Sequence, residues 1–270
     1  MEEKYYQIGD VAELMGMSRD TLRHYEKRGI LSPKKGQNGY RYYTSEEIHR
    51  LISILYQRKM NLGLSEIESI WSGSNTVQEI GSLLENRIME EEKAIRTHHQ
   101  TIARLQLAQT DYSHIQNDIG AMRMQDFPSV YVIAPRTTME ESINLWFTYS
   151  RNYPGLDMMY LYDEYSWQRR QGELKLEYKN TQLTLGRNLK EYVDYPLPQE
   201  PVMNNDPGLC VSTICASQTR IPAPEIIASM LDWADAQGLM VSRRLYSTWL
   251  SQGKHDGDST WFLQIYLPVF

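Results

Sequence analysis

Cationic side chains lie near the start of this chain at spacings that suit an anionic surface. Arg19, Arg23 and Lys27 recur every four residues, which places three positive charges along one face of a helix. Lys35 and Arg41 follow on either side of a short turn. Guanidinium and ammonium groups in such an array neutralise phosphates, and arginine also reads base edges. The chemistry predicted for this stretch is binding to DNA.

Two short helices must position the first three charges. The buried face of the first helix is expected at steps of three or four residues: Ile8, Val11, Leu14 and Met15. Gly16 suits the left-handed conformation that ends a helix, and Ser18 can cap the next one. In that second helix Leu22 points inward, and Gly29 ends it.

A basic hairpin and two further helices are predicted next. Asn38-Gly39 is a strong signal for a two-residue turn between strands. Thr44 opens a third helix with a capping box, and a fourth begins after Gly63. Their expected buried residues are Ile48, Leu51, Ile52, Leu55, Leu64, Ile67, Ile70 and Trp71. This layout is that of an all-helical winged helix-turn-helix.

The residue types in this region are more diagnostic of a protein family than the order of its helices and strands. The string S-x-x-T-L-R-x-Y-E starts at Ser18, and G-Y-R-x-Y starts at Gly39. Together they resemble the N-terminal domain of the MerR family of transcription regulators, over roughly the first quarter of the chain. Two residues depart from the family pattern. His24 replaces a frequent tyrosine, and Asn61 replaces a glycine at a left-handed position.

The MerR resemblance implies how the domain meets DNA. The residues expected at the interface are Ser18, Arg19, Thr21, Arg23, His24, Tyr25, Lys35, Tyr40, Arg41 and Tyr43. It also implies a homodimer on a palindromic promoter element with an overlong spacer. The activated dimer would bend and untwist the spacer so that RNA polymerase holoenzyme can use both promoter elements. The resemblance thus implies a transcription activator.

The distribution of charge fits a DNA-binding domain joined to an acidic domain. The chain has 270 residues and a net charge of −6. Residues 1–71 carry 11 Lys and Arg against 10 Asp and Glu, whereas the remainder carries 17 against 24. No apolar run is long enough to span a bilayer, and the N-terminus lacks the apolar stretch of a signal peptide. A cytoplasmic protein is expected.

The two cysteines do not form a recognisable metal site. Cys210 and Cys215 lie five apart in a predicted strand, so they should point to opposite faces as buried small residues. The thiolate metal sensing of some MerR relatives requires cysteines near the start of the long helix, and residues 76–119 contain none. Neither a metal nor another cofactor is expected.

A long helix is predicted from Thr76 to about Ile119. Its seam follows the alternating steps of four and three of a coiled coil: Leu84, Ile88, Ile95, His98, Ile102, Leu105 and Tyr112. One helix with such a seam needs a partner, so a homodimer is predicted, and the MerR resemblance implies an antiparallel pair. His98 is interpreted as setting the register, with pH sensing as the alternative.

The remaining residues predict two successive β-α-β-β units. The expected elements are 130–134, 139–150, 158–167, 173–185, 208–216, 224–236, 239–249 and 259–268. This duplication and the ending FLQIYLPV resemble the GyrI-like ligand-binding domain of multidrug-sensing MerR regulators. The predicted fold class is α+β with several domains. These are a DNA-binding domain at 1–74, a coiled-coil helix at 75–120 and an effector domain at 121–270.

Aromatic residues are dense in the effector domain, and tyrosine is costly to bury without a partner. They predict a cavity for a lipophilic, flat or cationic drug, with core and dimer packing as the alternative for each residue. The expected lining is Trp146, Tyr149, Tyr160, Tyr162, Glu164, Tyr246, Trp249, Gln264 and Tyr266. Related regulators often place a carboxylate where this chain has neutral Ser247 and Gln264. The charge for a cation would then come from another acid: Asp163, Glu164 or Glu173.

Two other functions stay open. Some GyrI-like relatives hydrolyse small lipophilic molecules, and Glu164 with a tyrosine could activate water. The chain has no G-x-S-x-G or H-E-x-x-H motif, however, so a regulator is predicted and not an enzyme. The other alternative is a protein-binding module without a small ligand.

Overall fold

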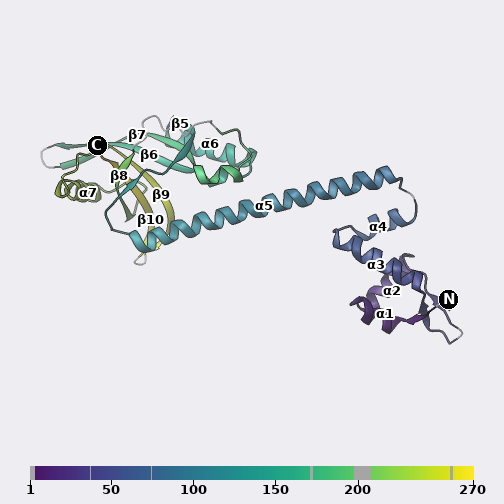
Figure 1. Ribbon diagram of the computed structural model, residues 1–270. Helices are drawn as coiled ribbons and strands as arrows, with labels where there is room; N and C mark the ends of the chain where they lie inside the picture. Colours follow the sequence, from purple (N-terminus) through teal and green to yellow (C-terminus); the bar gives the residue numbers. More distant parts are fainter. Residues whose placement is uncertain (1–3, 37, 74, 171–172, 198–207, 256–257) are drawn as a thin grey trace. The chain divides into compact units, whose positions relative to one another are not determined.

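The computed structural model describes residues 4–36, 38–73, 75–170, 173–197, 208–255 and 258–270 (Figure 1). The chain divides into two compact units, Met1–Ile95 and Arg96–Phe270. The long helix α5 (Val77–Asp118) begins in the first unit and ends in the second. No described helix is both long and apolar enough to cross a membrane.

The first unit is a helix-turn-helix with a small wing. Its helices are α1 (Ile8–Met15), α2 (Arg19–Lys27), α3 (Ser45–Lys59) and α4 (Leu64–Trp71). Its strands are β1 (Tyr6–Gln7), β2 (Lys34–Lys35) and β3 (Arg41–Tyr43), in the order β1-β3-β2. The expectation of an all-helical domain is wrong, because the domain contains this three-stranded sheet. Strand β3 of the wing pairs with β2 and also with β1, just before α1.

Local signals end and begin these helices as predicted. Gly16 and Asn61 are both left-handed, with φ of 63° and 59°. The Ser18 hydroxyl accepts a hydrogen bond from the backbone N–H of Thr21 at 3.0 Å. Thr44 caps α3 in the same way. These caps satisfy backbone groups that a helix leaves unpaired, so the helix boundaries follow from local chemistry.

Some details of packing differ from expectation. Three side chains expected in the core are instead 42% to 61% exposed: Leu14, Ile52 and Trp71. Ile54 is fully buried, because α3 turns the stripe that contains Leu51 and Ile54 toward the core. The wing loop is longer than the predicted two-residue turn, since Lys35 and Arg41 form the last strand pair before it.

Helix α5 presents two different faces. The predicted seam is open to solvent in this single chain, with Ile88, Ile95, Ile102, Leu105 and Tyr112 between 50% and 65% exposed. Within the second unit, the opposite face of the helix buries Gln100, Ala103 and Ile115. The Gln100 side chain donates to the Tyr192 carbonyl at 2.9 Å, which ties the helix to its own effector domain.

The second unit is built on a seven-stranded antiparallel sheet in the order β4-β8-β10-β9-β6-β7-β5 (Figure 1). Its strands are β4 (Arg123–Asp126), β5 (Val130–Thr137), β6 (Tyr160–Arg170), β7 (Glu173–Gly186), β8 (Leu209–Ser217), β9 (Arg244–His255) and β10 (Asp258–Pro268). Its helices are α6 (Met139–Asn152) and α7 (Pro224–Ala236), with 3₁₀ turns at Leu156–Met158 and Arg187–Tyr192.

The order β5-α6-β6-β7 recurs as β8-α7-β9-β10. In each set the last strand pairs with both others, and β6 and β9 join the two sets at the centre of the sheet. Strand β9 begins at Arg244, later than the predicted 239, because Val241 makes only an isolated bridge to Val269. The edge strand β4 was not predicted.

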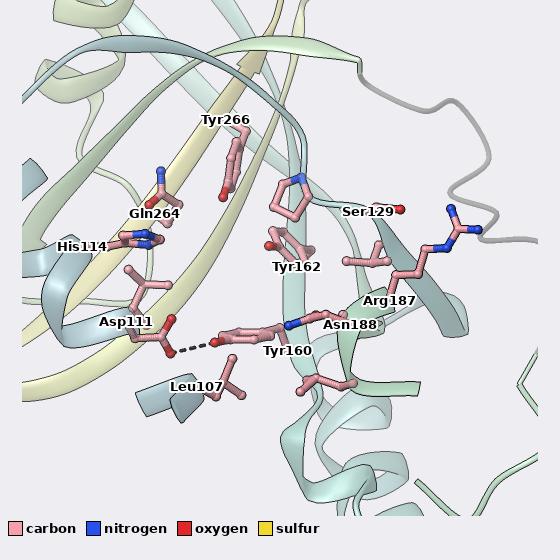
Figure 2. A pocket seen from close by; sticks show the side chains of 15 residues that line it. Leu107, Asp111, His114, Ser129, Tyr160, Tyr162, Arg187, Asn188, Gln264 and Tyr266 are labelled. Carbon is pink, nitrogen blue, oxygen red and sulfur yellow. Dashed lines mark hydrogen bonds between the residues drawn. The ribbon is translucent and has the colours of Figure 1, made fainter. Parts of the chain in front are cut away.

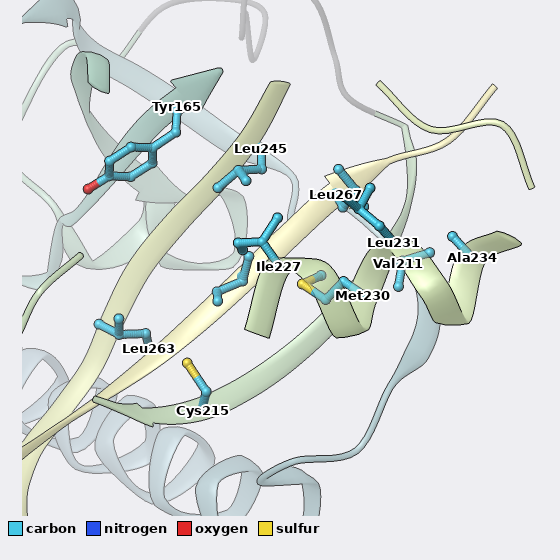
Figure 3. Packing of buried hydrophobic residues seen from close by; sticks show 11 residues of the cluster. Tyr165, Val211, Cys215, Ile227, Met230, Leu231, Ala234, Leu245, Leu263 and Leu267 are labelled. Atoms are coloured by element: carbon cyan, nitrogen blue, oxygen red, sulfur yellow. The ribbon is translucent and has the colours of Figure 1, made fainter. Parts of the chain in front are cut away.

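The two faces of the sheet differ in what covers them. Helix α7 packs on one face, where its Ile227 and Met230 join Leu263 and Ile265 of β10 in one buried cluster (Figure 3). The even-numbered neighbours of these strand residues point to the other face, which α5 approaches. Cys215 belongs to the α7 cluster and Cys210 to an aromatic cluster, so the two thiols do face opposite ways as predicted.

Candidate functional site

The surface of α2 carries the predicted cationic face. Arg19, Arg23 and His24 are exposed, whereas Leu22 on the opposite side is fully buried. Arg23 Nη1 lies 3.0 Å from Asp20 Oδ1 in a pair open to solvent. Exposed ion pairs of this kind are weak, so the guanidinium remains available to another anion.

Glu26 joins this helix to the wing. Its carboxylate accepts from Arg41 Nε at 2.6 Å and from the Tyr43 hydroxyl. Burial, followed by the neighbouring Glu26 carboxylate, raises the pKa of Tyr43 well above its usual value. The sequence reading missed Glu26 as a joining residue, although it stands within the quoted motif.

Two predicted DNA contacts lie in the core. Tyr25 is 5% exposed and Tyr43 is fully buried, so in this structure neither presents its ring to a partner. Their direct contact with the phosphate backbone is not supported by these positions, because both rings belong to the buried hydrophobic core of the first unit. Lys35 and Tyr40 are exposed at the wing, where phosphate contact is open to them.

Gly9 is a second residue that the sequence reading missed. A Cβ atom there would lie 3.0 Å from the Arg19 guanidinium, so the arginine rests against α1 at a position where a side chain would crowd it. Ser18 and Thr21 also have local roles, since their hydroxyls are 2.8 Å apart at the start of α2.

A cavity of about 540 Å³ lies between α5 and the sheet in the second unit (Figure 2). We call it the inner cavity. It is lined by Leu107, Asp111, His114, Pro128, Ser129, Val130, Tyr160, Tyr162, Gly186, Arg187, Asn188, Leu189, Leu250, Gln264 and Tyr266. Asp111 and His114 come from α5, whereas the tyrosines come from β6 and β10.

The inner cavity contains a carboxylate that the sequence reading did not find. The Tyr160 hydroxyl donates to Asp111 Oδ2 at 2.7 Å. Burial raises the pKa of Asp111 to about 6, and the hydrogen bond from Tyr160 only partly opposes that shift. The residue escaped notice because it lies within the predicted coiled-coil helix, where a single acid has no local signal of ligand contact.

Gln264 is the other polar group of note. It is 3% exposed, and its side-chain Nε2 has no hydrogen-bond partner within the described part of the chain. A buried unpaired donor is unfavourable unless a ligand or water accepts from it. Gln264 lines the inner cavity, so a ligand acceptor would satisfy it there.

A second cavity of about 650 Å³, the outer cavity, adjoins the first. It is lined by Arg104, Leu107, Ala108, Asp111, Tyr112, Ile143, Trp146, Phe147, Asp157, Met158, Met159, Tyr160, Leu161, Arg220, Trp249, Leu250, Ser251 and Gln252. The residues common to both cavities are Leu107, Asp111, Tyr160 and Leu250. The hydrogen-bonded pair of Asp111 and Tyr160 therefore lies between the two spaces.

Most charges of the outer cavity are already paired. Arg104 forms two hydrogen bonds with Asp157, at 2.5 and 2.6 Å. The Arg220 guanidinium lies 5.9 Å from the ring centre of Trp249, which is cation–π range, and 4.0 Å from Asp163. The outer cavity thus combines apolar walls with charges that compensate one another.

The predicted ligand residues fall into three groups. Those at the inner cavity are Tyr160, Tyr162, Gln264 and Tyr266, and those at the outer cavity are Trp146, Trp249 and again Tyr160. The others line neither cavity. Tyr149 packs on Tyr153, Tyr246 packs on Phe127, and Glu164 accepts from Asn180 at 3.0 Å.

A sequence model of the MerR HTH family regulatory proteins matches residues 6–73. An HTH-type transcriptional regulator, a ZntR homolog of Haemophilus influenzae, is 31% identical over 122 residues. That alignment covers 43% of this chain and 89% of the relative. The chain belongs to the MerR family. It is therefore a DNA-binding transcription regulator of the helix-turn-helix type.

Two further proteins resemble this MerR protein over different lengths. The multidrug-efflux transporter 2 regulator of Bacillus subtilis is 31% identical over 121 residues. The aligned part covers 42% of this chain and 44% of that relative. A solved chain from the EcmrR–DNA complex matches 98% of this MerR protein and 99% of its own length, at 17% identity. The TM-score of that match is 0.36.

Proposed function

We propose that this MerR protein is a ligand-responsive transcription activator that binds a palindromic promoter element as a homodimer. The observation that carries DNA recognition is the exposed cationic face of α2, held against the wing by Glu26. A helix presenting arginines beside a basic hairpin can place one element in the major groove and the other on the backbone. The wing and α2 would be the parts that meet DNA.

The homodimer would form through the seam of α5. Five large apolar side chains of that seam are half or more exposed in the single chain, which is unfavourable in water unless a partner covers them. A pair of such helices would place two copies of α2 on a two-fold symmetric site. His98 would lie within this seam as a polar residue that sets the register.

Activation would act through the promoter. The bound dimer would bend and untwist an overlong spacer, so that RNA polymerase holoenzyme can use both promoter elements. A ligand can favour that geometry only if it binds one dimer state more tightly than the other. The three segments 1–74, 75–120 and 121–270 would then read DNA, dimerise and sense the ligand.

The sensed ligand would be a lipophilic drug held in the effector domain, which we propose to be GyrI-like. Support comes from the inner cavity, where several aromatic rings meet one carboxylate and an unpaired amide donor. Pockets with apolar walls and a few polar groups are typical binding sites for small molecules. The similarity to a regulator of a multidrug-efflux transporter supports a drug as the ligand of this protein.

The hydrolase alternative loses its candidate acid. Glu164 accepts from Asn180 and lies 3.6 Å from Arg244, and it does not line either cavity. A carboxylate engaged in this way is not placed to activate water beside a bound lipophile. The regulator is therefore the function that the site supports better.

Selection of binding sites from a random duplex pool tests the proposal directly. Purified protein should enrich a site with two symmetric half-sites, and its affinity should fall steeply as salt rises. A lipophilic dye panel, followed by tryptophan fluorescence, tests the ligand part. Enrichment of an asymmetric single site would contradict the homodimer, and silence across the panel would contradict the drug sensor.

A further inference from the structure

Asp111 is an unusual residue for the face of α5 that packs on its own sheet. Its neighbours along this stripe are buried or line the cavities: Gln100, Ala103, Leu107 and Ile115. Asp111 has no ion pair with a Lys or Arg among the described residues. It accepts a hydrogen bond from Tyr160, and nearby His114 only partly opposes the rise of its pKa caused by burial. A carboxylate removed from water without a cationic partner lowers the stability of its ionised form.

The position of Asp111 leaves room for a cation. Tyr160 donates to Oδ2, and among the cavity residues drawn in Figure 2 the other carboxylate oxygen takes part in no hydrogen bond. The rings of Tyr160, Tyr162 and Tyr266 surround that space. Aromatic faces attract a cation, and a carboxylate in a partly desolvated site attracts it more strongly.

Other charges of the inner cavity do not take this role. Arg187 lies at its rim with an exposed side chain that points away from Asp111 and Tyr160 (Figure 2). Gln264 is neutral, and His114 stands one turn further along α5. Asp111 is thus the one carboxylate among the residues that line the inner cavity.

Extending the proposed function, we propose that Asp111 selects the charge of the ligand, and that a bound lipophilic cation bridges helix α5 to strand β6. The ligand would then act on the dimerisation helix directly. The seam residues Ile102 and Leu105 lie on the other side of the same helix, whereas Tyr112 also lines the outer cavity. A contact that draws residue 111 toward the sheet moves those seam residues with it, since a helix transmits displacement as a rigid element.

The test compares two ions of nearly the same shape and opposite charge, tetraphenylphosphonium and tetraphenylborate, on the full chain. The wild-type protein should bind the phosphonium more tightly than the borate. In Asp111→Asn, which keeps an oxygen to accept from Tyr160, that preference should fall by about tenfold or more. Asp235→Asn is the matched control, because it makes the same change of side chain at an exposed position of α7 that lines neither cavity.

Hydrogen exchange reports the coupling to α5. The phosphonium should slow exchange of residues 100–115 in the wild type and not in Asp111→Asn. Tyr160→Phe is a second variant that leaves the carboxylate in place, so it should keep the preference for the cation. An unchanged preference in Asp111→Asn, with normal folding by circular dichroism, overturns the role of Asp111. If neither ion binds the wild type, the drug-sensing proposal fails as well.

Discussion

Glu26 shows how one carboxylate can orient two elements that meet DNA. Replacing it by Gln should remove the charge that holds Arg41 while keeping an acceptor for Tyr43. We expect Glu26→Gln to lower stability by about 1–2 kcal/mol and to weaken DNA binding several-fold, because charge-assisted hydrogen bonds are the stronger ones. Thermal unfolding and gel retardation measure the two effects. Tyr43→Phe, which leaves Arg41 paired, should weaken DNA binding less; equal losses would argue against this role of Glu26.

Arg23 is the residue on α2 whose loss should affect DNA alone. Its only ion pair here is the exposed one with Asp20, so Arg23→Ala should leave the fold intact. We expect DNA affinity to fall by about 1–2 kcal/mol, measured by fluorescence anisotropy at fixed salt. Ligand affinity should not change. Arg151→Ala, on an exposed arginine of α6, is the control, and an Arg23→Ala protein with wild-type DNA affinity would remove Arg23 from the interface.

The raised pKa of Asp111 predicts that ligand binding depends on pH. Its pKa is raised to about 6, so the carboxylate is ionised at pH 7.5 and mostly protonated at pH 5. A lipophilic cation should therefore bind about tenfold more weakly at pH 5, as the attracting charge is lost. Tyr160, Tyr162, Tyr266 and His114 also face this site, and a positive charge on His114 would likewise repel a cation.

The Asp111→Asn and His114→Gln variants separate those two contributions in titrations with tetraphenylphosphonium. The first should lose most of the pH dependence, and the second should keep most of it. A pH dependence that survives Asp111→Asn and disappears in His114→Gln would assign the effect to the histidine.

The two faces of helix α5 have different partners. Ile95 lies on the exposed seam, so Ile95→Asp should place a charge in the dimer interface and yield a monomer. Analytical ultracentrifugation measures that change, and DNA affinity should fall with it. Thr97→Asp adds the same charge at an exposed position outside the seam and should remain dimeric. A dimeric Ile95→Asp protein would contradict the seam.

In the whole molecule, DNA binding and ligand binding are expected in different parts of the chain. A chain ending at Asp126 lacks most of the effector sheet and both complete cavities. It should still dimerise through α5 and bind DNA, but a lipophilic cation should no longer change its DNA affinity. Gel retardation with and without the phosphonium tests this. A monomeric product would argue against dimerisation by α5 alone, and a retained response would place the ligand site outside the effector domain.

The sequence alone determined those features of the protein that depend on local chemistry. Gly16 and Asn61 end helices, Ser18 and Thr44 begin them, and the repeated steps of three and four residues define α5. Caps and turns follow from the residue at the position itself, so they can be read without a neighbour in space. The MerR motifs gave the family by the same local means.

Only the tertiary structure decided which residues share a site. Asp111 comes from a helix predicted for dimerisation, yet it meets Tyr160 of a strand 49 positions later. Tyr43, expected on DNA, is fully buried because the wing folds back on α2. Side chains brought together across long sequence separations leave no periodic signal, and burial depends on which neighbours cover a face. The polar groups of the cavity were therefore beyond what spacing and residue type could predict.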